Sequence, residues 1–529
     1  METPGLGGLN WAVIIVYLLG TLAIGVWFTR KASTGTDSFF TANGRIPAWA
    51  AGFSIYATTL SAITYMSTPE QAFLTDWSYA AGNVAIFAII PLLIWFYIPF
   101  FRKLNVTTAY EYLEERFGPS IRVIGSVLFV LFHVGRVAIV IYLPTLAISS
   151  VTDINPAVVA AAVGVLSIIY TFLGGIEGVI WSDVVQGIIL LLGAVLILVF
   201  GIAAINGGLG TVVTDAVNDD KFITAKNWQI GGAAAAIPII FLGSVFNNLH
   251  QYTASQDVVQ RYQTTTSLKQ TARSLLVNGF LALLTIPLFY GIGTVLYSYY
   301  QHSGNLPENF NTSALVPYFV VTALPVGVAG ILIAAIFAAA QSTISSSLNS
   351  ISACVTVDLR DRFFPRKDGQ ARKGVGFARM VIIVAGAFSV AVALYLSATD
   401  QAETWNLFLS ITGLFGVPLA GVFALGIFTK RANTVGVIGG LILGAATAFW
   451  VQQNTTFTPF AVSAAAFVGA VLFGYLISAI AGALLGKNPH DVVPLTIYGK
   501  NSEYVRRTSS PVAPAGTPLV TTSPNDTVK

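Results

Sequence analysis

The chain is a series of long apolar segments separated by short polar ones. Thirteen segments of roughly 18–30 residues have the length at which an apolar helix crosses the hydrocarbon core of a bilayer. This pattern predicts an all-α integral membrane protein with about 13 transmembrane helices. The predicted spans are approximately 10–28, 47–66, 79–100, 121–149, 156–174, 179–204, 231–252, 275–299, 322–354, 377–397, 403–428, 435–452 and 458–485.

Composition agrees with a membrane environment. The chain is 55% hydrophobic and 9% charged, against roughly 25% charged residues in a soluble domain. The lipid bilayer is therefore the expected partner, and no nucleic-acid partner is expected. Cys354 is the single cysteine, which excludes a disulfide framework and a thiolate metal site. The first apolar run follows a leader without Lys or Arg, so we expect a retained helix rather than a cleaved signal peptide.

The distribution of Lys and Arg predicts the orientation. With residues 1–9 outside, 24 of the 27 basic residues fall in the inner loops and the tail. Lys221 and Lys226 fall outside, and Arg136 falls within a span. The sequence thus predicts an external N-terminus, a transmembrane domain over 10–485 and a cytoplasmic tail. The tail, 486–529, is polar and rich in Ser, Thr and Pro, so we expect it to be disordered.

Span two carries a dense run of hydroxyl groups and small residues. It reads Ser54-Ile-Tyr-Ala57-Thr58-Thr59-Leu60-Ser61-Ala-Ile-Thr64. One interpretation is a helix interface whose hydroxyls bond back to their own carbonyls. The other is a broken helix whose freed carbonyls and hydroxyls bind an ion and a substrate.

Span nine contains a polar stripe. Ser342, Ser345, Ser346 and Asn349 recur at i, i+3, i+4 and i+7, on one helix face. Hydroxyl and carbonyl oxygens are hard, neutral ligands that suit Na⁺, and the carboxylate cluster that Ca²⁺ prefers is absent from this run. Helix packing through small residues is the alternative.

Span seven ends in several polar side chains. Asn247, Asn248, His250 and Gln251 lie within five positions. Because such groups are costly against lipid, we expect them to face a water-filled cavity. Taken alone, His250 is more typical of an interior histidine with satisfied hydrogen bonds.

Two ionisable residues fall within predicted spans. Arg136 lies deep in span four, and Asp183 lies near the start of span six. They could form a structural ion pair with each other. The planar guanidinium of Arg136 is also well suited to bind a carboxylate on a substrate.

The order of the spans suggests an internal repeat. Spans two to six and seven to eleven form two sets of five, approximately 47–204 and 231–428. Because five is odd, the second set enters the membrane from the opposite side, which gives an inverted repeat. Both sets begin with an unusually polar helix, a pattern typical of a central binding site.

With these residues in view, the chain resembles the sodium:solute symporter family over residues 10–485. This family has the leucine-transporter-like five-plus-five inverted-repeat fold, and within it the chain looks most like the bacterial sodium-coupled sialic acid symporters. Besides the serine run of span nine, the resemblance rests on Ala57-Thr58-Thr59-Leu60-Ser61, Phe132-His133-Val-Gly135-Arg136-Val-Ala-Ile, Gly174-Gly175-Ile-Glu177-Gly178-Val-Ile-Trp181 and Thr253-Ala-Ser-Gln256-Asp257-Val-Val-Gln-Arg261-Tyr262.

The resemblance implies two sodium sites and a substrate site. The first sodium site would use carbonyls and hydroxyls of Ala57, Leu60, Ala339, Ser342 and Thr343. The second, which only some members have, would use Asp183, Ser342, Ser345 and Ser346. Substrate contacts would come from Thr59, Ser61, Thr64, Asn83 and Arg136, where Asn83 replaces a longer Gln of the sialic acid type.

The expected function is therefore sodium-coupled import of a small organic solute by alternating access, with sialic acid as the substrate and one or two Na⁺ ions co-transported. A symporter for a neutral sugar, proline or another carboxylate is the alternative. A passive channel would need a continuous pore lined by rings of ligands. A membrane enzyme is disfavoured because the four histidines are scattered and form no H-E-x-x-H motif. The expected location is the cytoplasmic membrane of a bacterium.

Overall fold

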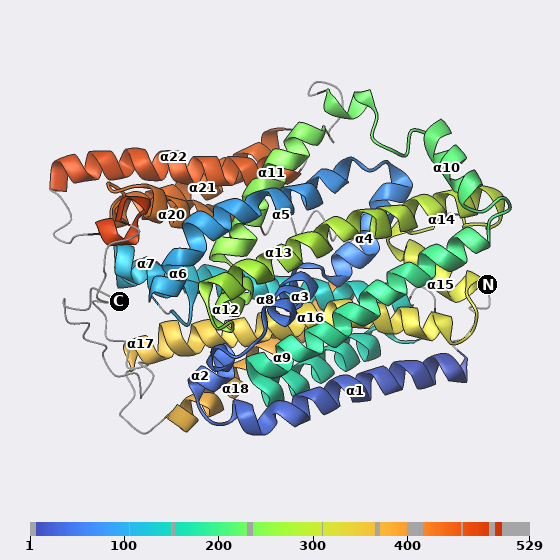
Figure 1. Ribbon diagram of the computed structural model, residues 1–529, viewed down its shortest axis with the longest axis horizontal. Coiled ribbons are helices and arrows are strands. Elements are labelled where there is room, and N and C mark those ends of the chain that lie inside the picture. Colours follow the sequence, from blue (N-terminus) through green and yellow to red (C-terminus); the bar gives the residue numbers. More distant parts are fainter. Residues whose placement is uncertain are drawn as a thin grey trace, which may run out of the picture.

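The structure is a computed structural model in which helices lie side by side along the longest axis of the molecule (Figure 1). No strand occurs among the residues that the structure describes. These residues are 7–104, 106–149, 152, 154–229, 236–308, 310–364, 371–398, 412, 416–455, 459–485 and 492–499. Their helices are α1 (Gly8–Ala32), α2 (Thr36–Thr41), α3 (Ala48–Thr59), α4 (Ala62–Leu74), α5 (Ala81–Leu92), α6 (Ile98–Leu104), α7 (Ala109–Phe117), α8 (Pro119–Ser149), α9 (Pro156–Ala203), α10 (Leu209–Asn218), α11 (Ile237–Leu249), α12 (Gln256–Gln263), α13 (Leu268–Thr285), α14 (Gly291–His302), α15 (Leu315–Ala323), α16 (Val328–Ala353), α17 (Asp361–Phe363), α18 (Ala371–Ala398), α20 (Val417–Phe428), α21 (Thr434–Asn454) and α22 (Pro459–Leu485).

Nine helical segments of this described part are long and apolar enough to cross a membrane. Nine is fewer than the thirteen predicted spans, for two physical reasons and because part of the chain is not described. Spans two and seven are each divided into two shorter helices. Spans five and six run together in α9, and the first half of span eleven falls mostly outside the described residues. The nine segments are Gly8–Thr29, Ser78–Leu104, Pro119–Tyr142, Pro156–Ala203, Leu268–His302, Val328–Phe363, Gly374–Ser397, Thr434–Asn454 and Pro459–Leu484.

Span two is a broken helix, as one of the two interpretations predicts. α3 ends at Thr59 and α4 begins at Ala62, and between them Leu60 and Ser61 have extended backbones (φ −85°, ψ 100° and φ −98°, ψ 175°). The Thr59 hydroxyl donates to the carbonyls of Ile55 and Tyr56. Such side-chain bonds compete with the helical pattern. The break leaves carbonyls near the end of α3 without helical donors.

Span seven is broken in the same way. α11 runs into a wide turn over His250–Ala254, and Ser255 then takes an extended backbone (φ −91°, ψ 116°) before α12 begins. Each predicted repeat therefore begins with a discontinuous helix. This agrees with the five-plus-five arrangement, while the exact limits of the two repeats remain predictions.

Spans five and six meet at a glycine within α9. A straight helix of 48 residues would be about 72 Å long, more than twice the thickness of the hydrocarbon core. Gly175 interrupts it with φ 56° and ψ −161°, a conformation that residues with a Cβ rarely adopt. A Cβ there would also lie 3.0 Å from the carbonyl oxygen of Phe39. This bend separates the two predicted spans.

The serine-rich helix α16 lies in the centre of the molecule and packs against α1, α8 and α9. Its serines and Asn349 are fully buried. At the edge of the bundle, α21 and α22 pack closely on each other (Figure 1). Their contact uses Gly436, Gly440 and Gly444, spaced four apart, which lets the two backbones approach.

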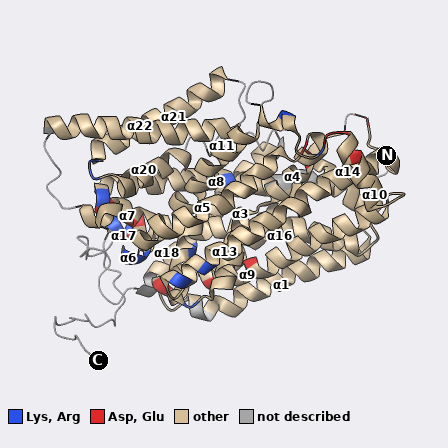
Figure 2. Cartoon of the chain, turned by 45° about the horizontal axis from the view of Figure 1, so that its top comes forward, with Lys and Arg blue, Asp and Glu red and all other residues tan. Residues whose placement is uncertain are grey.

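Basic residues gather near α6, α7 and α17, at the end of the bundle opposite the start of α1 (Figure 2). Some of the basic residues assigned to inner loops are buried within the bundle. Arg261 is fully buried in α12, and Arg122 is 2% exposed and paired with Glu114 and Asp358. The charge-based orientation therefore rests on fewer loop residues than the sequence indicated.

Part of the predicted disordered tail is folded. Val493–Leu495 and Ile497–Gly499 form two short 3₁₀ turns against the helices. The Leu495 side chain is fully buried. The backbone carbonyl of Leu495 accepts from the Tyr112 hydroxyl (2.9 Å), and the Lys103 ammonium donates to the backbone carbonyl of Pro494 (3.1 Å). The expectation of disorder does not hold for this stretch, because apolar burial and two backbone acceptors fix it. The rest of 486–529 lies outside the described residues.

Candidate functional site

A cavity of about 230 Å³ opens beside the break in span two. Its walls come from α3, α4, α5, α8, α11 and α13. All five residues predicted to contact substrate line it, although they come from four separate helical segments and the break between α3 and α4. They are Thr59, Ser61, Thr64, Asn83 and Arg136.

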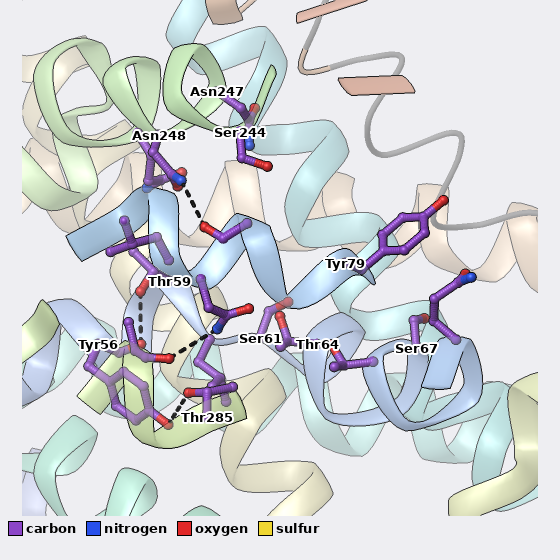
Figure 3. Close-up of a pocket in the computed structure, with 18 of the residues that line it drawn as sticks. Tyr56, Thr59, Ser61, Thr64, Ser67, Tyr79, Ser244, Asn247, Asn248 and Thr285 are labelled. Atoms are coloured by element: carbon purple, nitrogen blue, oxygen red, sulfur yellow. Dashed lines mark hydrogen bonds between the residues drawn. The ribbon is translucent and has the colours of Figure 1, made fainter. Parts of the chain in front are cut away.

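Many hydroxyl and amide groups line the cavity (Figure 3), together with the carboxylate of Glu70 and apolar side chains such as Leu60, Ile86 and Phe460. Ser61 and Thr64 lie on the side of α4, and Ser244 and Asn247 come from α11. Asn83, from α5, donates its amide N–H to the carbonyl of Ala282 (3.1 Å). This bond fixes the side chain and leaves its amide oxygen available to a ligand.

Four tyrosines also line the cavity, and the sequence analysis did not single them out: Tyr56, Tyr79, Tyr252 and Tyr290. Tyr56 and Thr285 are joined by a hydrogen bond of 3.0 Å between their hydroxyl groups (Figure 3). Tyr79 lies farther along the cavity. A tyrosine in an apolar span resembles any other aromatic core residue, so no pattern along the chain distinguished them.

The polar end of span seven meets the expectation in part. Asn247, Asn248 and Gln251 line the cavity. His250 does not: it is buried with its ring 5.4 Å from that of Phe132. The helix turns between these positions, so consecutive polar residues do not share one face.

Arg136 does not pair with Asp183. Its Nη1 donates to Oδ2 of Asp257 at 3.0 Å, and its Nη2 donates to the Thr58 carbonyl at 3.1 Å. The side chain is 3% exposed, and its Nε has no hydrogen-bond partner. The predicted structural alternative is therefore wrong in its partner, although an internal counter-ion does exist.

Asp257 stands directly after the break in span seven. It also accepts from the Ser255 hydroxyl (2.6 Å), the Gln251 amide (3.2 Å) and the backbone N–H of Val258 (2.9 Å). Asp257 belongs to one of the motifs on which the family resemblance rests, but no role was predicted for it from the sequence. A carboxylate following a break in an intramembrane helix was the available signal.

The residues predicted for the first sodium site come together between α3 and α16. The Ser342 hydroxyl donates to the carbonyl of Ala57 (2.9 Å), and the Thr343 hydroxyl donates to that of Ala339 (3.4 Å). Leu60 follows at the break and lines the cavity. The same hydroxyl oxygens can offer lone pairs to a cation when their O–H bonds rotate away.

Two of the four residues predicted for the second sodium site, Asp183 and Ser346, contact a cationic side chain. Asp183 is fully buried, and its Oδ2 accepts from Arg261 Nη2 at 2.8 Å and from the Ser54 hydroxyl at 2.5 Å. Arg261 Nη2 also donates to the Ser346 hydroxyl at 2.6 Å. Ser345 lies next to Ser342 and donates to its carbonyl (3.1 Å). The sequence did not predict the Arg261 contact.

Within the part of the chain that the structure describes, no group of three His, Cys, Asp or Glu residues could hold a metal ion. The candidate sites instead offer carbonyl and hydroxyl oxygens with a single carboxylate. This donor set fits a monovalent hard cation.

A model of the sodium:solute symporter family matches residues 39–444. The chain belongs to the sodium:solute symporter family. It is 44% identical over 477 residues to a sodium/sialic acid symporter of Aliivibrio fischeri, covering 90% of this chain and 94% of the relative. It is 46% identical over 444 residues to a sodium/sialic acid symporter of Proteus mirabilis, covering 84% and 89%.

A solved structure agrees in fold. It is a substrate-bound, outward-open sodium-coupled sialic acid symporter, described as having a novel Na⁺ site. The two structures align with a TM-score of 0.85 and 42% identity, covering 90% of this chain and 98% of the other. The predicted leucine-transporter-like helical fold is confirmed. The chain is a multi-pass, sodium-coupled membrane transporter, not an enzyme.

Proposed function

We propose that this symporter carries sialic acid together with Na⁺ into a bacterial cell across the cytoplasmic membrane. The observation that carries the proposal is the buried guanidinium of Arg136, which lines a cavity that many hydroxyl and amide groups also line. Sialic acid offers a carboxylate for the guanidinium, and hydroxyls and an N-acetyl amide for the rest of the wall. The high identity to two sodium/sialic acid symporters supports this substrate.

The proposed mechanism is alternating access around this cavity. The first sodium would bind between the carbonyls near the end of α3 and the hydroxyls of Ser342 and Thr343, and so hold the broken span two against α16. That contact would order Thr59 and Ser61 for the substrate. A second sodium would bind at Asp183, Ser345 and Ser346. A sugar acid would take Thr64, Asn83 and Arg136 as further contacts.

Calorimetric titration of the purified protein tests the substrate. We expect sialic acid to bind in Na⁺ buffer and to bind far more weakly in K⁺ buffer. Proline and an uncharged hexose should show no binding under either condition. Tight binding of the hexose, or of proline, would contradict the assignment while leaving a sodium symporter in place.

The proposed orientation can be tested with an impermeant thiol reagent on intact cells. In a Cys354→Ala background, Ser303→Cys should react from outside, because it is exposed at the end of α14 near the proposed outer surface. Arg431→Cys is exposed at the other end, in the loop after α20, and should react only after permeabilisation. Labelling of Arg431→Cys from outside intact cells would show that the orientation is opposite to the proposed one.

The proposed second sodium predicts an electrical signature. Two Na⁺ ions with one monoanion carry one net positive charge per cycle, which adds about 2.3 kcal/mol of driving force at 100 mV. We expect wild-type proteoliposomes to generate a sodium-dependent current, and Asp183→Asn to lose current per substrate or to stop accumulation. Asp358→Asn, a buried carboxylate paired with Arg122, is the control. A wild-type cycle that generates no current would contradict the proposal that a second sodium is transported.

A further inference from the structure

Two buried ion pairs meet on the short helix α12. Near its start, Asp257 pairs with Arg136 at 3.0 Å. One turn later, Arg261 pairs with Asp183 at 2.8 Å. The two pairs are also joined through the helix backbone, because the Arg261 guanidinium donates to the backbone carbonyl oxygen of Asp257. The four side chains are 0–3% exposed, so they form one buried chain of alternating charge with no net charge.

Each end of this chain touches a different candidate ligand site. Arg136 lines the cavity, where the substrate carboxylate would bind. Arg261 Nη2 contacts both Asp183 and Ser346, which are proposed ligands of the second sodium. One carboxylate thus competes with substrate for Arg136, and one guanidinium competes with Na⁺ for Asp183.

We propose that Asp257 and Arg261 are internal counter-ions that substrate and the second sodium replace together. This proposal rests on the proposed function. When the substrate carboxylate takes Arg136 and Na⁺ takes Asp183, the two displaced groups, Asp257 and Arg261, pair with each other. In the unloaded transporter they return to Arg136 and Asp183, so no buried charge is left alone.

The exchange makes binding of the two ligands cooperative. Substrate alone leaves one buried carboxylate without a partner, and sodium alone leaves one buried guanidinium without a partner. Only both ligands together leave every charge paired. Because an uncompensated buried charge is strongly unfavourable, each ligand promotes binding of the other, and the effect is reciprocal.

Substitutions at the two counter-ions are expected to act with opposite sign. In Asp257→Asn, Arg136 has only the substrate as partner, so substrate affinity in Na⁺-free buffer should rise. In Arg261→Gln, Asp183 has only sodium as partner, so sodium affinity should rise. Substrate affinity in Na⁺ buffer should fall, because the displaced Asp257 then has no guanidinium to pair with. In both variants, the enhancement of substrate affinity by Na⁺ should shrink by about tenfold, within the range typical of coupled sites.

A second buried ion pair provides the matched control. Arg122 and Asp358 are 2.7 Å apart and 0–2% exposed, and they touch neither candidate site. The double variant Arg122→Gln/Asp358→Asn removes charges of the same kind away from α12. It should keep the wild-type ratio of substrate affinities in Na⁺ and choline buffers. A ratio that falls equally in this control would assign the effect to general loss of packing.

The experiment is calorimetric titration of the purified full-length proteins with sialic acid in Na⁺ and choline buffers. The wild type is also titrated with the amide of sialic acid, which should not displace Asp257 from Arg136. We therefore expect Na⁺ to enhance binding of the acid more than binding of the amide. This comparison uses only the wild-type protein, so it does not depend on whether a variant folds.

Three results separate the hypotheses. Equal enhancement of acid and amide by Na⁺, or unchanged coupling in folded Asp257→Asn and Arg261→Gln, overturns the counter-ion exchange. Failure of the wild type to bind sialic acid in Na⁺ buffer overturns the proposed function instead. Loss of coupling in the two α12 variants, with substrate affinity raised in Asp257→Asn and lowered in Arg261→Gln, supports the exchange.

Discussion

Arg136→Ala is expected to abolish sialic acid binding. Among the described residues that line the cavity, Arg136 has the only basic side chain. A buried, bidentate contact with a carboxylate is stronger than a neutral hydrogen bond. Arg136→Lys keeps the charge but loses the planar fork, so its affinity should fall tenfold or more, about 1.4 kcal/mol. Calorimetric titration in Na⁺ buffer measures both. Equal affinities of the wild type, Arg136→Ala and Arg136→Lys for sialic acid would contradict the sialic acid assignment.

The ion pair with Asp257 gives this prediction a control. Arg136→Ala leaves a fully buried carboxylate unpaired, which costs about 3–5 kcal/mol in comparable cases. Its melting temperature should therefore fall as well. Arg136→Gln/Asp257→Asn removes both charges and should recover most of the thermal stability without recovering binding. If binding returns with stability, Arg136 is a structural residue only.

The double variant Ser342→Ala/Thr343→Ala should lose sodium-driven transport, or need more than about tenfold higher Na⁺ for half-maximal uptake. Both hydroxyls lie against the carbonyls of the broken span two, and their removal takes away two hard oxygen ligands. The measurement is uptake by proteoliposomes across a range of sodium concentrations. An unchanged dependence of uptake on sodium concentration would contradict the proposed first sodium site.

A serine farther along the same helix is the control. Ser352 is also fully buried in α16, but its hydroxyl donates to the Ala378 carbonyl (2.7 Å), away from the cavity. Ser352→Ala changes a buried hydroxyl to a methyl at a comparable position. It should retain the wild-type sodium requirement, and a similar loss in this variant would mean that α16 tolerates no such change.

The break in span two illustrates what local sequence can predict. A run of hydroxyls and small residues offers the backbone competing hydrogen bonds within one turn, and the structure places the extended residues, Leu60 and Ser61, inside that run. The polar residues at the end of span seven predicted a water-filled cavity, but the break in that span was not predicted. In contrast, the fate of His250 depended on which way a distorted turn faces, and this is not written in any local pattern.

The tail shows the opposite limit. Composition predicted disorder over 486–529, yet Leu495 is buried against α7. A few apolar residues in a polar stretch give a weak signal. Only the docking surface formed by α6 and α7 makes their burial favourable.

The sequence by itself determined the class of the protein and marked span two as a candidate broken helix, because apolar length and polar clusters are short-range patterns. The five predicted substrate contacts that line the cavity came from the family resemblance. The tertiary structure alone decided which charges pair. Asp257 is 121 residues from Arg136, and Arg261 is 78 residues from Asp183. Since a charge in a membrane takes whatever partner the fold brings near it, the choice among candidates depended on how α8, α9 and α12 pack together.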